Sequence, residues 1–279
     1  LNCRNSELQP LLVDLSEDGL GRLDFIDRAV VNARTNHILT PDLVRGGTAR
    51  WEEKPLSPTY GLVTQGNRTF DDFRFVRAWW EVPPVDIGTR WQRWQKGGEY
   101  QPFFSSTPYV IDWPKEDDGA VMRSFGISKV GTDAQVAQSS RYWWRSGLVG
   151  PAMNTTGAGF NIRILPKNQI FSAKSTVVIP KGRKQAMILL SLLNSRTLRW
   201  FLYQQGAGLA GNTGKIKTLP IIWPNGNTEQ SLESLAQDAT MLMAELESFR
   251  ETSPCFKDLI RQHSDLVERY RECADRLDA

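Results

Sequence analysis

The stretch QIFSAKSTVVIP (169–180) leads directly into GRKQAMILLSLLNSRTLRWFLYQQ (182–205), and the period of the apolar residues changes at the junction. The first part is rich in β-formers and predicts two short strands, at 169–174 and 175–180. The second part repeats apolar residues at helical spacing, which predicts a helix that is interrupted near Asn194-Ser195. After a glycine-rich loop, IKTLPIIWP (216–224) is predicted as a short closing strand. This order of elements predicts an α+β fold.

Segments rich in aromatic and β-branched residues precede this stretch, and each predicts a short strand. They are FRFVRAWWEV (73–82), YVIDW (109–113), RYWW (141–144) and FNIRIL (160–165). Between the first two, GTRWQRWQKGGEYQPFF (88–104) is predicted as a long loop in which Trp91 and Trp94 alternate with basic residues. Such rings can stack on nucleotides, although tryptophans of a β-rich protein also pack in the core.

Two amphipathic segments close the chain, TEQSLESLAQDATMLMAELESF (228–249) and CFKDLIRQHSDLVERYRECADRLDA (255–279), with Ser253-Pro254 between them. Each places its apolar residues on one face, which predicts an antiparallel helical hairpin. Near the other end, LGRLDFIDRAVVNAR (20–34) has roughly helical spacing and predicts a further helix.

These patterns divide the chain into three parts. Residues 1–54 are predicted to be a linker or helical segment from an upstream domain, because the sequence opens without an initiator Met. Residues 55–225 are predicted to form a β-rich domain with a helix near its end. Residues 226–279 are predicted to form the helical hairpin.

Charge is distributed unevenly along the chain. Residues 134–228 contain no Asp or Glu but carry twelve basic side chains. The net charge is −1 over residues 1–50, +10 over 51–224 and −6 over 225–279, which together give +3. A surface with cations and no anions attracts polyanions, of which nucleic acid is the commonest. The alternative is a solvated basic surface without a ligand.

Motifs for catalysis are missing. No Gly-Lys-Ser/Thr end of a phosphate-binding loop occurs, and Asp71-Asp72 lacks the Asp/Glu-x-Lys partner of a nuclease site. The histidines and cysteines lack metal-ligand spacing, so we expect no catalytic residue and no metal site. Few cysteines, odd in number, are typical of a reducing cytoplasm, and no apolar run of membrane-spanning length occurs, so no membrane partner is expected.

Binding chemistry is well represented in the acid-free stretch. Arg and Lys pair with guanine and Asn pairs with adenine in the major groove of DNA. The side chains of these classes in the stretch are Arg141, Arg145, Asn154, Asn161, Arg163, Lys167, Asn168, Lys174, Asn194 and Asn212.

Two groups of motifs resemble known families. GLVTQGNRTFDDFRFVRAWWEV (61–82), KGGEYQPFF (96–104) and YVIDW (109–113) are similar, in order and spacing, to the target-recognition region of large adenine-specific DNA methyltransferases from bacterial phage-defence islands of the BREX type. That family has a Gly-Leu-x-Thr-Gly-(Asp)-Asn segment that leads into Arg-Phe-x-Arg-x-Trp-Trp-Glu-Val. Here TQGNRTFDDF holds extra residues, which leaves the roles of Gly66, Asn67 and Asp72 open.

The second resemblance concerns FSAKSTVVIPKGRKQAMILLSLLNSRTLRWFLYQQ (171–205) and IKTLPIIWP (216–224). They are similar to the end of specificity domains in type I and type IIG restriction-modification systems, where a helix with Leu-Leu-Asn-Ser follows a β-rich part and a strand ending in Leu-Pro-Ile closes the domain. Together the two resemblances cover residues 60–224.

The resemblance implies sequence-specific DNA recognition for N6-adenine methylation. The Asn-Pro-Pro-Tyr/Phe motif and the glycine-bearing motif for S-adenosylmethionine do not occur here. We therefore expect no cofactor in this segment, with S-adenosylmethionine bound by a catalytic domain or subunit outside it. The expected partners are double-stranded DNA, an N-terminal methyltransferase domain or catalytic subunit, and other defence-complex proteins. The acidic helices of 228–279 are expected to pack on one of these proteins.

On this reading, the DNA contacts are expected from the basic side chains of the recognition part. The predicted residues are Arg74, Arg77, Lys96, Arg141, Arg145, Asn154, Arg163, Lys174, Lys181, Arg183, Lys184 and Lys215. Lys181, Arg183 and Lys184 are predicted to anchor phosphates at a helix N-terminus, the alternative being a solvated basic turn.

Two other functions stay open at this point. One is the specificity part of a type IIG restriction enzyme, in which an upstream segment also holds a nuclease. The other is a non-catalytic interaction subunit of a defence complex that has lost DNA reading.

Overall fold

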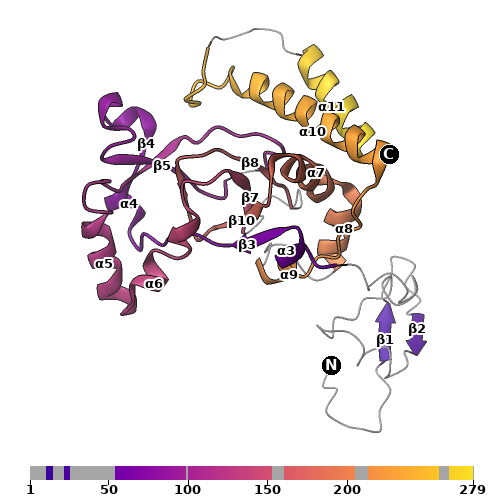
Figure 1. Cartoon of the computed structure of the whole chain (residues 1–279), viewed down its shortest axis with the longest axis horizontal. Helices are drawn as coiled ribbons and strands as arrows, with labels where there is room; N and C mark the ends of the chain where they lie inside the picture. The colour runs from indigo at the N-terminus through magenta and orange to yellow at the C-terminus, as the bar shows by residue number, and fades with distance from the viewer. Residues whose placement is uncertain are drawn as a thin grey trace.

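The structure, a computed structural model, describes residues 11–14, 22–25, 54–98, 100–152, 160–204, 213–257 and 264–278. Its strands form a hairpin of β1 and β2 and two four-stranded sheets (Figure 1). The strands are β1 (Leu11–Asp14), β2 (Arg22–Phe25), β3 (Gly61–Thr64), β4 (Val76–Ala78), β5 (Trp91–Gln95), β6 (Tyr109–Asp112), β7 (Gly147–Pro151), β8 (Arg163–Leu165), β9 (Gln169–Phe171) and β10 (Ser175–Pro180).

Helices flank the sheets and follow them in the sequence. The α-helices are α3 (Leu56–Thr59), α4 (Asp72–Phe75), α5 (Ala120–Val130), α6 (Asp133–Val136), α7 (Arg183–Asn194), α8 (Arg196–Gln204), α9 (Thr213–Lys217), α10 (Gly226–Glu247) and α11 (Ser264–Asp278). Single 3-10 turns are η2 (Trp79–Glu81), η3 (Pro84–Asp86) and η4 (Ser140–Tyr142). In the described residues, no helix is long and apolar enough to cross a bilayer.

The sheet with strand order β3-β10-β7-β8, called the middle sheet below, is antiparallel and buried on both faces. Neighbouring side chains of one strand point to opposite faces, and β10 shows this with two adjacent valines. Val178 packs in the core under the helices, whereas Val177 packs in the core toward the second sheet. This double burial explains why STVVIP is a run of apolar and β-branched residues instead of an alternating strand.

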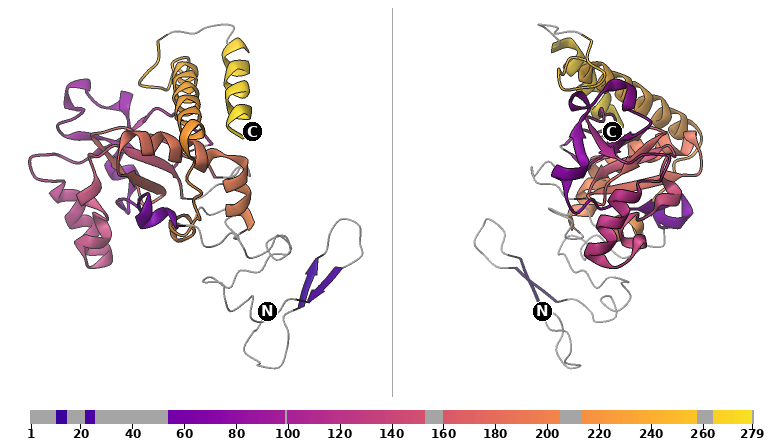
Figure 2. Two further views of the ribbon diagram at one scale, coloured as in Figure 1. Left: turned by 45° about the vertical axis from the view of Figure 1, so that its right-hand side comes forward. Right: turned by 90° about the vertical axis from the view of Figure 1, so that its left-hand side faces the viewer.

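Helices cover one face of the middle sheet. Leu189, Leu190 and Leu193 of α7 are buried in the core that also holds Leu235 of α10 and Leu266 of α11. Figure 2 shows α10 and α11 side by side, as the predicted hairpin requires. The α+β class, with a β-rich part and a C-terminal helical pair, is therefore confirmed.

The second sheet, with order β4-β6-β5-β9, is called the outer sheet. Its strands β5 and β9 run parallel although the other pairs are antiparallel, so that segments far apart in sequence meet at this edge. An isolated parallel bridge between Asn67 and Ser172 continues the pairing of β9. As a result, residues 66–73 and residues 171–174 lie next to each other.

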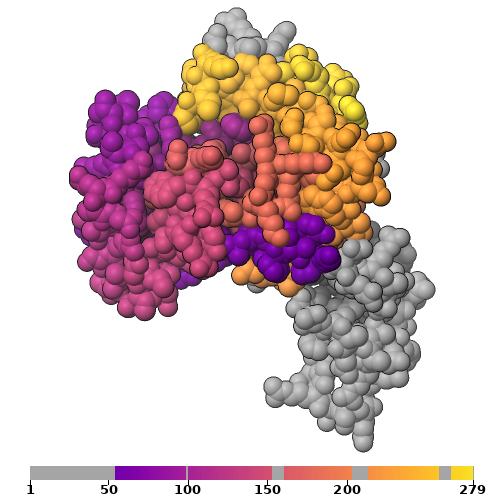
Figure 3. All heavy atoms as spheres, in the orientation of Figure 1, coloured from indigo at the N-terminus to yellow at the C-terminus, as the bar shows by residue number. Residues whose placement is uncertain are grey.

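The turn after α10 reaches back to the outer sheet. Trp79 Nε1 donates a hydrogen bond of 3.1 Å to the carbonyl oxygen of Thr252, and Ser106 donates to the carboxylate of Glu247. Figure 3 shows the C-terminal helices, orange to yellow, spanning from the middle of the molecule to the purple part that includes the outer sheet. The helical pair therefore packs on the middle sheet, and α10 with the turn after it also contacts segments that flank the outer sheet.

Several predicted elements are correct. The strand at 175–180 has the predicted bounds, and the strand at 109–113 ends one residue earlier. The helix of 182–205 is interrupted at Ser195, whose ψ of 150° is extended.

Other predicted elements are wrong. The expected loop 88–104 contains β5, the expected strand RYWW is the turn η4, and α9 replaces the start of the expected closing strand at 216–224. Of the expected strand 73–82, only Val76–Ala78 is extended, because α4 and η2 occupy its ends. Within the expected helix 20–34, the described residues Arg22–Phe25 form a strand.

Candidate nucleic-acid interface

Three hollows adjoin one another beside the outer sheet. Residues of 67–72 and 172–174 line the first, residues of 72–81 line the second, and residues of 94–109 and of the turn after α10 line the third. Asp72 is shared by the first and the second hollow, and Lys96 and Tyr109 are shared by the second and the third. The shared residues make the hollows one continuous surface. We call it the aromatic–basic face and define it by Arg68, Phe70, Asp72, Phe73, Arg77, Trp80, Lys96, Tyr109 and Lys174.

Aromatic side chains on this face are open to solvent. The exposed fraction is 39% for Phe70, 96% for Phe73, 53% for Trp80 and 41% for Tyr109. Large apolar side chains that gather on an exposed surface mark an interaction site more often than single scattered ones do. Here they stand beside cations, which is the combination that binds nucleic acid through stacking and phosphate contacts.

The segment before α4 is fixed to the sheets at its base. A Cβ on Gly66 would lie 1.6 Å from the carbonyl oxygen of Phe171, so only glycine fits this close approach. The next residue, Asn67, is fully buried and accepts a hydrogen bond of 2.8 Å from Trp94 Nε1. Its backbone also bonds to Phe171 and Ala173, so Asn67 anchors the segment and does not face solvent.

From this anchor the chain turns outward. Phe70 has a φ of 59°, in the left-handed region, and Asp71 caps α4 by accepting a 3.1 Å hydrogen bond from the backbone of Arg74. The short helix places Phe73 at its exposed surface, and Arg77 donates 2.5 and 2.7 Å bonds to the carbonyl oxygens of Phe73 and Val76. Exposed rings and a cation thus stand on a turn whose base is rigidly held.

An ion pair lies at the centre of the face. Lys96 Nζ is 2.8 Å from Asp72 Oδ2, and Thr69 donates a further hydrogen bond to this carboxylate. Burial alone raises the pKa of Asp72, but the bonds from Lys96 and Thr69 and the charge of Lys174 together hold the pKa below its ordinary value. Asp72 is therefore ionised at neutral pH.

The first two hollows carry more positive than negative charge. Arg68, Arg77, Lys96 and Lys174 line them, whereas the carboxylates are Asp72 and Glu81. Three of these cations, Arg77, Lys96 and Lys174, are predicted DNA-contact residues, and the fold brings them together from 77, 96 and 174 in the sequence. The excess of cations favours a polyanionic ligand.

Arg163 is in a different position from the one that the sequence suggests. Its side chain is 1% exposed, and its guanidinium donates to the backbone carbonyl oxygens of Lys96, at 3.3 Å, and Gly97. The predicted surface contact with DNA is inconsistent with this placement, because a buried guanidinium does not reach a duplex. Burial lowers the pKa of Arg163 to about 10.

The remaining predicted residues are dispersed over the molecule. Arg74 lies 5.0 Å from the ring centres of Phe75 and Phe125, and Arg141 and Arg145 lie 4.8 and 5.8 Å from the ring centre of Tyr142. Lys215 is in α9, and Asn154 lies outside the described residues. These side chains stay predictions as DNA contacts.

The predicted phosphate anchors do surround a helix N-terminus. Gly182 precedes α7, and Lys181, Arg183 and Lys184 are exposed around it. Lys184, however, forms a 2.7 Å ion pair with Glu229 of α10. This basic turn therefore already has an acidic neighbour within the protein.

Other basic side chains of the acid-free stretch also pair with the acidic C-terminal helices. Arg196 lies 2.9 Å from both Asp275 and Asp278 of α11. Together with the Lys184–Glu229 pair, these contacts show that the cations of 134–228 do not form one surface. The interpretation of this stretch as a single DNA-binding face is wrong, because its side chains point to the core, to the helical pair and to solvent.

Sequence reasoning missed the aromatic part of the face, and of its two interpretations of the tryptophans, core packing is the one that the structure shows for Trp91 and Trp94. Trp91 and Trp94, predicted as candidate stacking residues, are 8% and 1% exposed and pack in the core. The exposed rings instead come from the FDDF (70–73) and WW (79–80) segments and from Tyr109. The neighbouring cation Arg68 was not predicted. The motif FRFVRAWWEV (73–82) contains Phe73 and Trp80, so the sequence does indicate aromatic residues in this part of the face. The strand predicted for it, however, would have buried every second ring.

Comparisons with known proteins concern the fold. No protein-family model matches the chain, and no curated protein does. Part of the type IIL restriction-modification enzyme MmeI, solved in complex with DNA, has a similar fold, with a TM-score of 0.51 and 16% identity over 80% of this chain and 33% of that one. The type IIG restriction endonuclease BpuSI is also similar, with a TM-score of 0.43 and 13% identity over 81% of this chain and 31% of that one. The chain thus spans about a third of each of these enzymes.

Proposed function

We propose that this chain recognises a specific sequence in double-stranded DNA for a restriction-modification enzyme. The observation that carries the proposal is the aromatic–basic face, where exposed rings and an excess of cations stand together on an anchored turn. The fold likeness to a part of MmeI, a restriction-modification enzyme solved with DNA, supports it.

We further propose that the associated reaction is N6-adenine methylation in a phage-defence system of the BREX kind. This finer assignment rests on the sequence resemblance of 61–113. Methyl transfer from S-adenosylmethionine would take place in a methyltransferase domain or subunit that binds this chain, since the motifs for that chemistry do not occur in these residues. A division between reading and chemistry is physically reasonable, because a methylated base must leave the duplex while the sequence is read in the groove.

A type IIG enzyme, with a nuclease in addition, is the second candidate. Its support is the resemblance of 171–224 to specificity domains of that class. Site-specific cleavage of DNA by the complete enzyme, in addition to methylation, would decide for it.

Binding to duplex DNA across a range of salt concentrations tests the proposal. Each phosphate that a cation neutralises contributes about 0.9 to the slope of log affinity against log salt. We expect Lys174→Ala and Arg77→Ala each to lower the slope by up to about that amount. Arg276→Ala, an exposed cation of α11, is the matched control and should leave the slope unchanged.

Two results would contradict the proposal. One is the absence of binding even at low salt, and the other is an equal effect of the control and the two face variants. If binding is found, selection from a random duplex library should yield a common sequence, and mapping of N6-methyladenine in cells with and without the gene tests the methylation assignment.

A further inference from the structure

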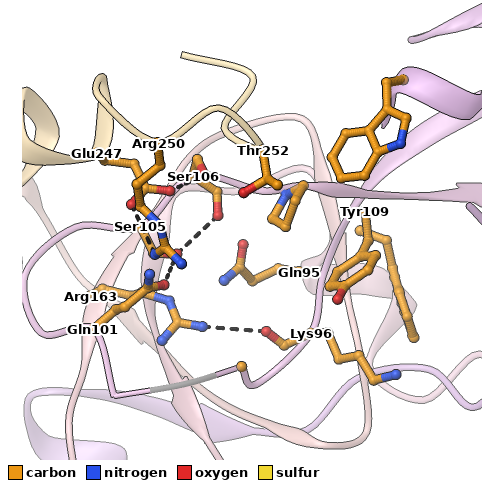
Figure 4. A pocket seen from close by; sticks show the side chains of 14 residues that line it. Gln95, Lys96, Gln101, Ser105, Ser106, Tyr109, Arg163, Glu247, Arg250 and Thr252 are labelled. Atoms are coloured by element: carbon orange, nitrogen blue, oxygen red, sulfur yellow. Dashed lines mark hydrogen bonds and ion pairs between the residues drawn. The ribbon is translucent and has the colours of Figure 1, made fainter. Parts of the chain in front are cut away.

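The third hollow is a cavity of about 280 Å³ between the outer sheet and the turn after α10 (Figure 4). Ligand pockets for drug-sized molecules hold roughly 300–1,000 Å³, so this cavity suits one ring system and not an extended ligand. Figure 4 shows Tyr109 and Lys96 on one side, Glu247 and Arg250 on the other, and Gln95 between them.

One wall of the cavity is aromatic. Trp80 and Tyr109 both line it, and both are open to solvent. Trp80 is held by an edge contact with Trp79, at 6.0 Å between ring centres, and by η2, whose Glu81 accepts a 2.7 Å bond from Ala78. The Trp80 ring can therefore receive a flat group with little loss of side-chain entropy.

The floor of the cavity is polar and preorganised. The amide oxygen of Gln95 accepts bonds of 3.1 and 3.2 Å from Arg163, and its amide nitrogen donates a 2.8 Å bond to Thr107. The hydroxyl of Thr107 in turn donates a 3.0 Å bond to Gln169, and these bonds fix the orientation of the Gln95 amide. Gln101 accepts a 2.5 Å bond from Ser105, and its amide nitrogen has no partner among the described residues. Amide groups of this kind recognise the edges of nucleobases.

Among the described residues that line the cavity, cations outnumber carboxylates. They are Lys96, Arg163 and Arg250 against Glu247, and Arg250 lies 3.3 Å from Glu247 as an ion pair. Among the described residues, no carboxylate contacts Arg163, and its Nη1 is buried without a hydrogen-bond partner. Because a buried cation is weakly screened, its field favours an anionic group at the mouth of the cavity.

We propose that this cavity binds a single nucleotide, with its base stacked on Trp80 and Tyr109, the edge of the base at Gln101 and its phosphate toward Lys96. The inference deepens the proposed function and rests on it in one respect. The cavity opens onto the aromatic–basic face through Lys96 and Tyr109, so the nucleotide is taken to be one that has left the stack of the bound DNA.

Fluorescence of 2-aminopurine, which stacking quenches, tests the inference with three probes. The probes are a duplex with 2-aminopurine opposite an abasic site, the same duplex with 2-aminopurine paired to thymine, and the free deoxyribonucleoside 5′-monophosphate. We expect saturable quenching and tighter binding for the first duplex. Trp80→Ala should weaken that binding about 5- to 100-fold, in line with the loss of one base–aromatic stack. Trp80→Phe, which keeps a ring, should restore most of it.

Trp200→Ala is the matched control, because Trp200 of α8 is 46% exposed and does not line the cavity. Equal binding of the two duplexes, or equal effects of Trp80→Ala and Trp200→Ala, would overturn the inference. In that case salt-dependent binding of the paired duplex would still support the proposed function. If neither duplex binds, the proposed function fails. If the free monophosphate is nevertheless quenched in a Trp80-dependent way, the cavity binds a free nucleotide.

Discussion

Asn194 connects the helical layer to the middle sheet, and its removal should destabilise the fold strongly. Its side-chain oxygen accepts a 2.9 Å hydrogen bond from the backbone nitrogen of Ile162, and its side-chain nitrogen donates 2.8 and 3.0 Å bonds to the carbonyl oxygens of Ile162 and Leu190. Ile162 is fully buried just before β8. The backbone nitrogen of Phe103 also donates a 2.9 Å bond to its carbonyl oxygen, but among the described residues its N–H has only the asparagine as a partner. The asparagine thus replaces a missing backbone partner.

Asn194→Ala leaves the N–H of Ile162 buried without a hydrogen-bond partner, whereas its C=O keeps the bond from the backbone of Phe103. One unsatisfied buried group costs about 1–3 kcal/mol, and we expect a loss of about this size in the free energy of unfolding. Because domains are commonly stable by about 5–15 kcal/mol, this is a large share of the total. Asn194→Asp should be at least as harmful, since it keeps an acceptor for the N–H but turns the donor into a buried acceptor facing a carbonyl.

Urea unfolding followed by circular dichroism measures the effect as a shift of the midpoint at unchanged slope. Asn227→Ala is the control, because Asn227 is exposed in the first turn of α10 and a surface change of this kind stays within about 0.5 kcal/mol. A midpoint for Asn194→Ala equal to that of Asn227→Ala would refute the structural role of the three bonds. The role of a base-reading side chain, which the residue type alone suggests, would then deserve a binding assay.

Four further outcomes are expected. Gly66→Ala should prevent stable folding, because the added Cβ meets the carbonyl oxygen of Phe171 at 1.6 Å, whereas Gly182→Ala, with nothing within 4 Å, should be tolerated in the same thermal melt. Asp72→Asn should steepen the salt dependence of DNA binding by up to about 0.9, because it frees the paired lysine and removes a negative charge; an unchanged slope would place DNA elsewhere. Folding lowers the pKa of Asp72 below its unfolded value near 3.8. The stability that its ion pair adds is therefore present above pH 3.8 and is lost as the pH falls through the lower folded pKa. In acid titrations, the free energies of unfolding of the wild type and of Asp72→Asn should therefore converge below pH 4. Phe73→Ala should weaken DNA binding without lowering the melting temperature, as 96% exposure leaves little packing to lose.

The sequence predicts the elements whose pattern is local and misses those that depend on distant partners. STVVIP and the interrupted helix that follows are read correctly, because β-branched residues and helical periodicity act within a few residues. In contrast, WQRWQ has no strict alternation, since β5 is covered by other segments along most of its length, and it is a strand only because β6 and β9 pair with it. The functions of Gly66 and Asn67 likewise become visible only when Phe171 is placed against them.

The same limit applies to charge. A count along the chain finds the acid-free stretch of 134–228, yet a surface potential depends on which charges meet in space. Lys184 and Arg196 lie in that stretch and face carboxylates of α10 and α11, so that part of the asymmetry is an attraction within the protein. Lys174 comes from the same stretch but is carried by the parallel pairing of β9 to the side of Arg68, Arg77 and Lys96. The candidate interface therefore arises from sheet topology, and a charge substitution at Lys174 should affect DNA binding more than one at Lys184, whose cation already has a partner.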